Sequence, residues 1–244
     1  MKQLLWAERQ KLHRSKIVLV AIFATIMVAI IVFAQGQFVF YGSHYIDGSG
    51  WFMTATQSLA TFYVLPAMIA LLGSYIICRE EQDDTIKSLR LIPINEVKLT
   101  IAKMIVSFSF SIFIYFLLFI ITFLVESALH FHALSIGMVL GFFKIYLLNG
   151  LGIFLAISPI IALVARIKKG YWIALIFAEI YSFAGLFAST SNVLKTIYPI
   201  AAVFNLSGYY KASSSSMIIS FIVLLSCGCL SLIILYSLNH NRHP

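Results

Sequence analysis

The sequence predicts an all-α integral membrane protein with six transmembrane helices. Of its 244 residues, 61% are hydrophobic and 11% are charged, whereas soluble domains have about 25% charged residues. The mean hydropathy of +0.97 indicates the same class. The apolar runs are long and lack a strict alternation of polar and apolar residues, which favours helices over a β-barrel. Either structure satisfies the bilayer's demand that spanning backbone groups hydrogen-bond internally.

Six largely uncharged stretches are long enough to cross a bilayer as helices. We predict spans at residues 17–34, 59–78, 104–125, 145–165, 171–188 and 217–238, within one transmembrane domain covering 1–244. The first span follows basic residues, as in a secretory signal sequence. Its 18 apolar residues exceed the usual core of about 7–15, so we expect it to be retained. Pro66 predicts a kink in the second span.

The N-terminal segment, residues 1–16, contains five basic residues, one acidic residue and Trp6. Leu4, Leu5 and Leu12 share one side of a helix, although Glu8 lies among them. This pattern favours an elbow helix that lies in the headgroup layer of the membrane. A solvated basic tail is the alternative.

Arg79–Lys98 is the only long charged stretch, and it contains five of the nine acidic residues. Asp83 or Asp84 is suited to cap a short helix that ends at Pro93. Apolar residues recur within it at three-residue spacing: Ile86, Leu89 and Ile92. Nothing else in this segment buries their face, so we predict a helix that docks onto the membrane interface or another protein.

Two further segments are expected on the opposite side of the membrane. Residues 35–56 contain no lysine or arginine, and we expect an outer loop or a short surface helix there. Residues 189–216 include an apolar stretch, Ile197–Leu206, that is too short to cross the membrane. We expect a re-entrant or surface-lying pair of short helices in it. We expect the fourth span to start nearer Gly137 than residue 145, and pairs of small residues four apart in it predict close helix contacts; they are Gly137 with Gly141 and Gly152 with Ala156.

The basic residues are distributed unequally along the chain. Fourteen of the 17 lysines and arginines lie in the N-terminal segment, residues 79–103, the turn at 166–169 and the C-terminal tail. The positive-inside rule therefore predicts that both termini are cytoplasmic. This asymmetry also accounts for the net charge of +8, so we infer no nucleic-acid partner.

The chain contains no recognisable enzyme site. It has no Gly-Lys pair and therefore no P-loop, so ATP would have to bind to another subunit. His130 and His132 have no further ligand cluster, and we assign no metal site. Glu179 is the only acid well inside a span. Ser182, three positions on, shares its helix face and is within reach of a hydrogen bond to it. We favour a polar clasp between packed helices for this pair; the alternative is a proton or substrate site.

These features resemble the membrane subunit of ABC-2 type ABC exporters, in particular the small six-span permeases associated with bacitracin resistance, lantibiotic immunity and peptide export. The resemblance covers the whole chain. It rests on the elbow helix, with Glu8, Lys11 and Arg14, and on the loop after the second span. The matching loop residues are Glu80, Glu81, Thr85, Leu89, Pro93 and Lys103. Asp84 stands where glycine is usual, and Asn95 stands near a common arginine position.

The resemblance also implies partners and a lid. Two permeases, identical or homologous, would pair in the plasma membrane, and each would dock its loop helix into a separate P-loop ATPase that binds ATP and magnesium. The expected contact residues are Glu80, Glu81, Asp84, Thr85, Ile86, Leu89, Arg90 and Pro93. The segment between the last two spans resembles the family's re-entrant lid, with Tyr198, Pro199, Phe204 and Tyr209.

The expected cargo is a hydrophobic or amphipathic antimicrobial peptide, expelled for export or self-immunity. Two alternatives come from other classes of protein. One is a proton-coupled secondary transporter that uses Glu179, and the other is a membrane scaffold without transport activity.

Overall fold

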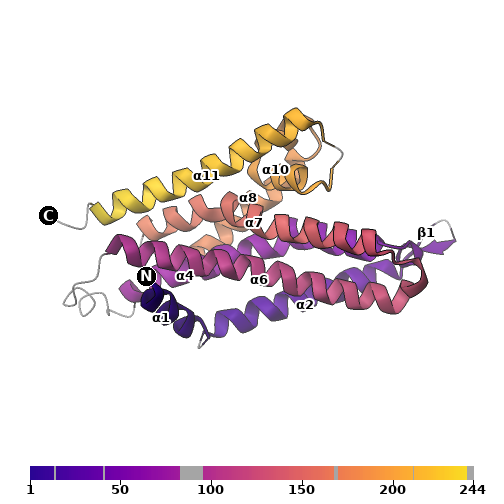
Figure 1. Cartoon of the computed structure of the whole chain (residues 1–244), viewed down its shortest axis with the longest axis horizontal. Coiled ribbons are helices and arrows are strands. Elements are labelled where there is room, and N and C mark those ends of the chain that lie inside the picture. The colour runs from indigo at the N-terminus through magenta and orange to yellow at the C-terminus, as the bar shows by residue number, and fades with distance from the viewer. Residues whose placement is uncertain (14, 41, 83–95, 168–169, 211, 241–244) are drawn as a thin grey trace.

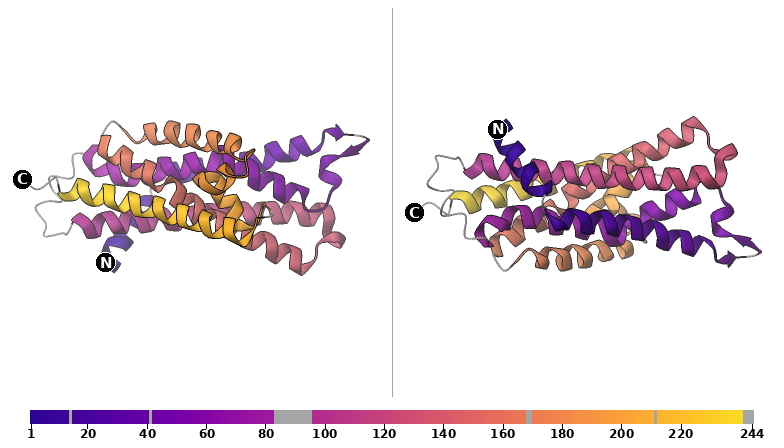
Figure 2. Two further views of the ribbon diagram at one scale, coloured as in Figure 1. Left: turned by 90° about the horizontal axis from the view of Figure 1, so that it is seen from above. Right: turned by 90° about the horizontal axis from the view of Figure 1, so that it is seen from below.

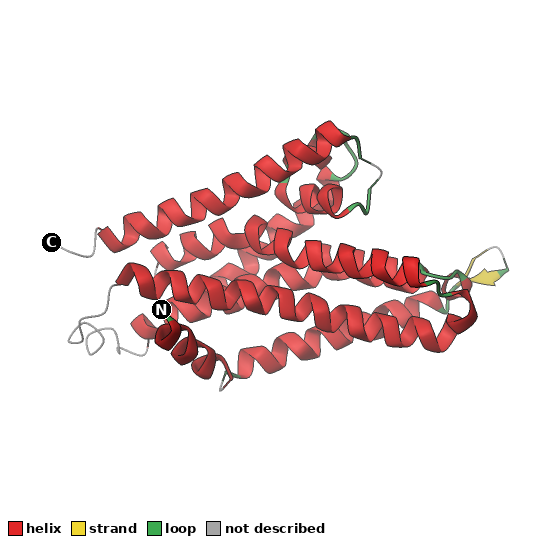
Figure 3. Cartoon of the chain, in the orientation of Figure 1, coloured by secondary structure: helices red, strands yellow, loops and turns green. Residues whose placement is uncertain are grey.

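A computed structural model describes residues 1–13, 15–40, 42–82, 96–167, 170–210 and 212–240. These residues form a bundle of long helices that run side by side along the longest axis of the molecule, with a two-stranded hairpin at one end (Figure 1 and Figure 3). The predicted all-α membrane fold is therefore confirmed.

The helices follow the apolar runs of the sequence in chain order. They are α1 (Lys2–His13), α2 (Lys16–Gly36), α3 (Trp51–Leu59), the π-helix η2 (Ala60–Val64), α4 (Leu65–Gln82), α6 (Glu96–His130), α7 (Ile136–Ile167), α8 (Trp172–Ala188), α9 (Leu194–Ile197), α10 (Pro199–Ser207) and α11 (Ser214–His240). The strands β1 (Val39–Phe40) and β2 (Ser43–His44) pair antiparallel. Two 3₁₀ helices, η1 (Tyr45–Asp47) and η3 (Phe131–Ala133), complete the connections.

Five helical segments of the described residues are long and apolar enough to cross a membrane. They are Lys16–Gly36, Trp51–Glu80, Val97–Ala133, Ile136–Ala165 and Ser214–Ser237. The predicted fifth span corresponds to α8, which has 17 residues and is therefore only about 25 Å long. The start of α2 and the last turn of α11 lie at the same end of the bundle (Figure 1).

The second span begins earlier than we predicted. Its helix starts at Trp51 and continues through η2 and α4, so residues 51–56 are the first turns of a span rather than a separate outer element. Thr56 and Gln57 interrupt the apolar run, yet both are fully buried. Glu126, expected in an outer loop, is likewise fully buried within α6. Hydropathy missed these turns because their polar side chains face other helices and not lipid.

The bundle has two distinct ends. We call the end that holds α1, the end of α4 and the start of α6 the loop end, and the end that holds β1 and β2 the hairpin end (Figure 1). At the loop end α1 lies at an angle to the long helices (Figure 2). The predicted docking helix, Asp84–Ile92, lies between α4 and α6 and outside the described residues.

The short helix α10 packs against α7, α8 and α11, and its residues Ile200–Phe204 are almost completely buried. Two glycines leave room for it. A Cβ at Gly152 would lie 2.9 Å from Val203, and one at Gly185 would lie 3.0 Å from Ile200. Gly152 thus makes the kind of close contact we predicted. Gly137 and Gly141 do not, since no described atom lies within 4 Å of a Cβ at either position.

Candidate functional site

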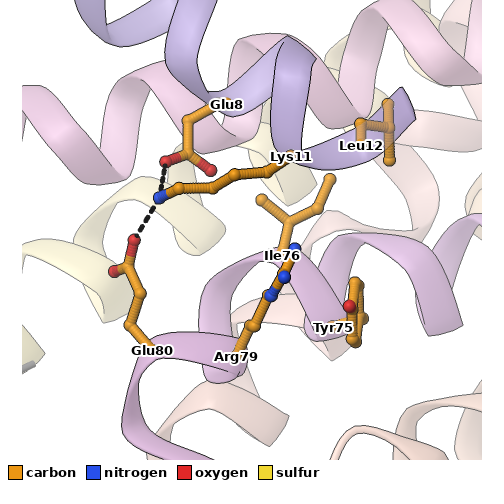
Figure 4. A pocket seen from close by; sticks show the side chains of 7 residues that line it. All are labelled: Glu8, Lys11, Leu12, Tyr75, Ile76, Arg79 and Glu80. Carbon is orange, nitrogen blue, oxygen red and sulfur yellow. Dashed lines mark hydrogen bonds and ion pairs between the residues drawn. The ribbon is translucent and has the colours of Figure 1, made fainter. Parts of the chain in front are cut away.

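Four charged side chains from three helices meet at the loop end, and Figure 4 shows three of them. Lys103 Nζ lies 2.6 Å from Glu80 Oε2, while Lys11 Nζ lies 2.8 Å from Glu80 Oε1 and 2.7 Å from Glu8 Oε1. Glu8 and Lys11 belong to α1, Glu80 to the last turn of α4, and Lys103 to α6. They form a chain of ion pairs with alternating charge, which we call the charge network.

The charge network is largely shielded from solvent. Glu8, Glu80 and Lys103 are only 3%, 7% and 4% exposed. The Lys103 ammonium also lies 3.4 Å from the carbonyl oxygen of Ile77, near the C-terminal end of α4, where the helix dipole favours a cation. Because a buried charge is costly without a partner, the network couples the positions of α1, α4 and α6.

Lys11 is charged in this arrangement. Burial alone would lower the pKa of its ammonium group, but hydrogen bonds and charge attraction from Glu8 and Glu80 outweigh burial and raise the pKa above its ordinary value. Lys11 therefore remains a cation at neutral pH and bridges the two carboxylates.

The charge network lies at the base of the segment that is predicted to contain the docking helix. Glu80 and Lys103 lie on either side of the segment that contains this helix, and their ion pair closes the base of the segment. Of the predicted contact residues, Glu80 belongs to the network and Glu81 to the last turn of α4. The others lie outside the described residues: Asp84, Thr85, Ile86, Leu89, Arg90 and Pro93.

A small pocket adjoins the network between α1 and α4 (Figure 4). Its lining consists of Glu8, Lys11, Leu12, Tyr75, Ile76, Arg79 and Glu80. The Arg79 guanidinium lies 5.6 Å from the centre of the Tyr75 ring, within the range of a cation–π contact. The pocket therefore combines charged groups with an apolar wall at the point where α1 meets the end of the second span.

Glu179 and Ser182 do not form the hydrogen bond that we considered. Ser182 Oγ instead donates to the carbonyl oxygen of Phe62, at 2.8 Å, and lies 3.3 Å from that of Thr61. Ser182 thus contacts the second span from α8. Glu179 is half-buried on α8, and its carboxylate makes no hydrogen bond to any described residue.

The predicted lid residues lie close together. Pro199 begins α10, and the hydroxyl of Tyr198 donates to the carbonyl of Tyr181 in α8 at 2.5 Å. The ring of Phe204 packs edge-on against that of Tyr209, with centroids 5.0 Å apart. Sequence reasoning missed two further partners of Phe204: the Phe62 ring of η2, which stacks on it at 4.4 Å, and the Tyr210 ring, whose centroid lies 5.7 Å away.

Another buried acid, Glu126, lies near the hairpin end. Glu126 Oε1 accepts a hydrogen bond of 2.6 Å from the backbone N–H of Gly50 and lies 3.0 Å from His130 Nδ1. Gly50 precedes the first turn of α3, where the helix dipole favours a negative charge. Glu126 therefore fixes the start of the second span against the end of the third.

The fold and site define a multi-pass membrane protein in which a buried ion pair closes the segment between two spans. A family model described as ABC-2 family transporter protein matches residues 4–185. The chain therefore belongs to the ABC-2 family of transporter proteins and is a transport permease, a membrane component that is not itself catalytic. No curated protein sequence matches the chain. The matched region includes the charge network and most of α8, whereas α9, α10 and α11 follow it.

Proposed function

We propose that the chain is the permease subunit of an ATP-driven exporter in the plasma membrane, with its loop end and both termini in the cytoplasm. The main support is the ion pair of Glu80 and Lys103, which closes the base of the segment holding the predicted docking helix. A displacement of that segment therefore acts directly on the second and third spans. The excess of basic residues in the segments at the loop end supports the orientation.

ATP binds to a partner in this proposal. The chain has no Gly-Lys pair for a P-loop, and ABC-2 permeases associate with ATPase subunits and with further permease subunits. Two permeases, identical or homologous, assemble with two P-loop ATPases, which bind ATP and magnesium. The Asp84–Ile92 helix of each permease docks into a cleft on an ATPase. Ile86 and Leu89 fill the cleft, while Glu81, Lys87 and Arg90 lie at its rim. Glu80 holds the base of the segment through its ion pairs with Lys11 and Lys103.

The proposed cargo is a hydrophobic or amphipathic antimicrobial peptide, expelled for export or self-immunity. The 21 phenylalanines and 12 tyrosines of the chain suit an apolar cargo. Several of these rings, those of Phe62, Phe204 and Tyr209, contact one another at α10 (Pro199–Ser207), which we call the lid helix.

Leu89→Asp tests the docking helix. A carboxylate in a dry cleft without a partner costs on the order of a few kcal/mol, enough to release a helix that docks with micromolar affinity. Removing a rim charge with Lys87→Ala costs about 0–1 kcal/mol, which makes it the matched control. The assay is co-purification of a tagged permease with its P-loop ATPase partner, together with substrate-dependent ATP hydrolysis in lipid.

We expect Leu89→Asp to abolish both signals and Lys87→Ala to preserve them. If Leu89→Asp preserves both in a folded, inserted protein, this helix is not the coupling element. In a transport assay of the same complex, loss of transport in an assembled Glu179→Gln variant would contradict the polar clasp and favour a proton or substrate role for Glu179.

A further inference from the structure

The second span contains a local defect in its backbone hydrogen bonding. Pro66 has no N–H, so it donates neither to the carbonyl of residue 62, as in an α-helix, nor to that of residue 61, as in a π-helix. The preceding turn widens into the π-helix Ala60–Val64, where the N–H of Leu65 donates to the carbonyl of Ala60. Inside an apolar bundle, the carbonyls of Thr61 and Phe62 need a donor from elsewhere.

Ser182 of α8 provides that donor. Its hydroxyl is fully buried, and it lies 2.8 Å from the carbonyl oxygen of Phe62 and 3.3 Å from that of Thr61. These are the two carbonyls to which an N–H at residue 66 would donate, that of Phe62 in an α-helix and that of Thr61 in a π-helix. From α6, the hydroxyl of Tyr115 donates to Thr61 Oγ1 at 3.1 Å. Three spans are therefore joined at the π-helix.

The π-helix also contacts the lid. The Phe62 ring stacks on that of Phe204, with centroids 4.4 Å apart and an interplanar angle of 15°. Both rings are buried, and Gly152 and Gly185 hold α10 close to α7 and α8. In the other direction, α4 runs about 24 Å from the end of the π-helix to Glu80 in the charge network. The second span thus connects the charge network to the lid helix.

We infer that Ser182 is a positioning residue for transport. Its hydrogen bond sets the register of the π-helix that places Phe62 against Phe204, so that movement of α4 at the loop end reaches α10. This inference rests on the proposed function, because an ATPase must move the loop end. In this inference, the second span connects the docking segment to the lid helix.

Hydrogen exchange of the assembled transporter in lipid tests the assignment, with and without ATP and magnesium. In the native complex we expect ATP to change exchange at residues 96–103, 60–66 and 199–207. In Ser182→Ala we expect basal exchange at 60–66 to rise on the order of tenfold, since one buried hydrogen bond is lost. The ATP response should persist at 96–103 and disappear at 199–207.

The control is Ser109→Ala, the same substitution at an exposed position of α6 whose hydroxyl bonds only within its own helix, to Ile105; it should behave as the native protein does. A native response at 199–207 in Ser182→Ala would overturn the inference and leave the proposed function intact. In contrast, a native complex without an ATP response at 96–103 would contradict the proposed function. Basal hydrogen exchange at residues 60–66 is measured without an ATPase, so it tests the Ser182 hydrogen bond independently of the proposed function.

If Ser182→Ala fails to assemble, a second variant tests the inference. Pro66→Ala restores an N–H at residue 66, so the double variant Pro66→Ala/Ser182→Ala should recover assembly and the Tm lost in Ser182→Ala. A double variant that is no more stable than Ser182→Ala would show that the hydroxyl does not replace the missing N–H, and would overturn the inference.

Discussion

Lys103→Met removes one charge from the network and preserves the length of the side chain. Lys103 is 4% exposed, and its ammonium lies 2.6 Å from Glu80 Oε2. Removing one partner of a buried ion pair costs about 3–5 kcal/mol, because the other charge remains buried. Lys11 still bonds the second oxygen of Glu80 at 2.8 Å, so we expect a cost at the lower limit, about 3 kcal/mol.

Thermal unfolding in lipid nanodiscs measures this cost. In a chain of this size, 1 kcal/mol lowers the Tm by roughly 2–4 °C, so Lys103→Met should lower it by about 6–12 °C. The scan rate is held constant, since unfolding of membrane proteins is often irreversible. Lys144→Met, the same substitution at an exposed position of α7, is the matched control and should change the Tm by less than about 2 °C.

A double-mutant cycle with Glu80→Gln isolates the pair. If the two side chains stabilise each other, Glu80→Gln/Lys103→Met should cost less than the sum of the single variants, because no unpaired carboxylate or ammonium of this pair remains. Additive costs would refute the conclusion that their ion pair fixes the base of the segment between α4 and α6.

Three further predictions concern other parts of the chain. Gly152→Ala should lower the Tm, since its Cβ would lie 2.9 Å from Val203 and overpacking costs about 1–3 kcal/mol; Gly137→Ala, with no described atom within 4 Å, should not. Gln57→Leu should raise the Tm, because both polar atoms of this buried amide lack a partner among the described residues and such groups cost about 1–3 kcal/mol; a lower Tm would contradict this prediction. The third prediction is the pH dependence of the Tm difference between the native protein and Lys11→Met. This difference should stay constant through neutral pH and vanish only above the ordinary Lys pKa of 10.5, because stability from a raised lysine pKa is lost as pH rises through the raised value. A difference that vanishes near neutral pH would contradict a charged Lys11.

The helices were predictable because lipid imposes a simple rule on the outward residues of a bundle. Apolar runs located every long helix, and the lack of any run of suitable length at 197–206 correctly indicated short helices there. The rule fails for residues that face other helices. Gln57 and Glu126 are fully buried and lowered the hydropathy of turns that belong to the second and third spans, so the predicted spans were too short.

The charge network was only partly visible in the sequence. Glu8 and Lys11 are three residues apart and adjacent on one helix face, and Glu80 and Lys103 were selected through the family resemblance. Their pairing depends on how α1 packs against α4 and α6, and Lys11 and Glu80 are 69 positions apart. Hydropathy and spacing within a single helix contain no information on such a contact.

The hydrogen-bond partners of Ser182 are a further contact that the sequence alone does not predict. Its three-residue spacing from Glu179 suggested a bond within α8, yet its partners are the carbonyls of Thr61 and Phe62. The reason lies in Pro66, which removes the donor that these carbonyls need inside the bundle. A proline within a span therefore predicts that a neighbouring span supplies a hydroxyl, but the sequence does not specify which one. Serines in the third, fourth and sixth spans were equally good candidates, and only the packing of α8 against the π-helix selects Ser182.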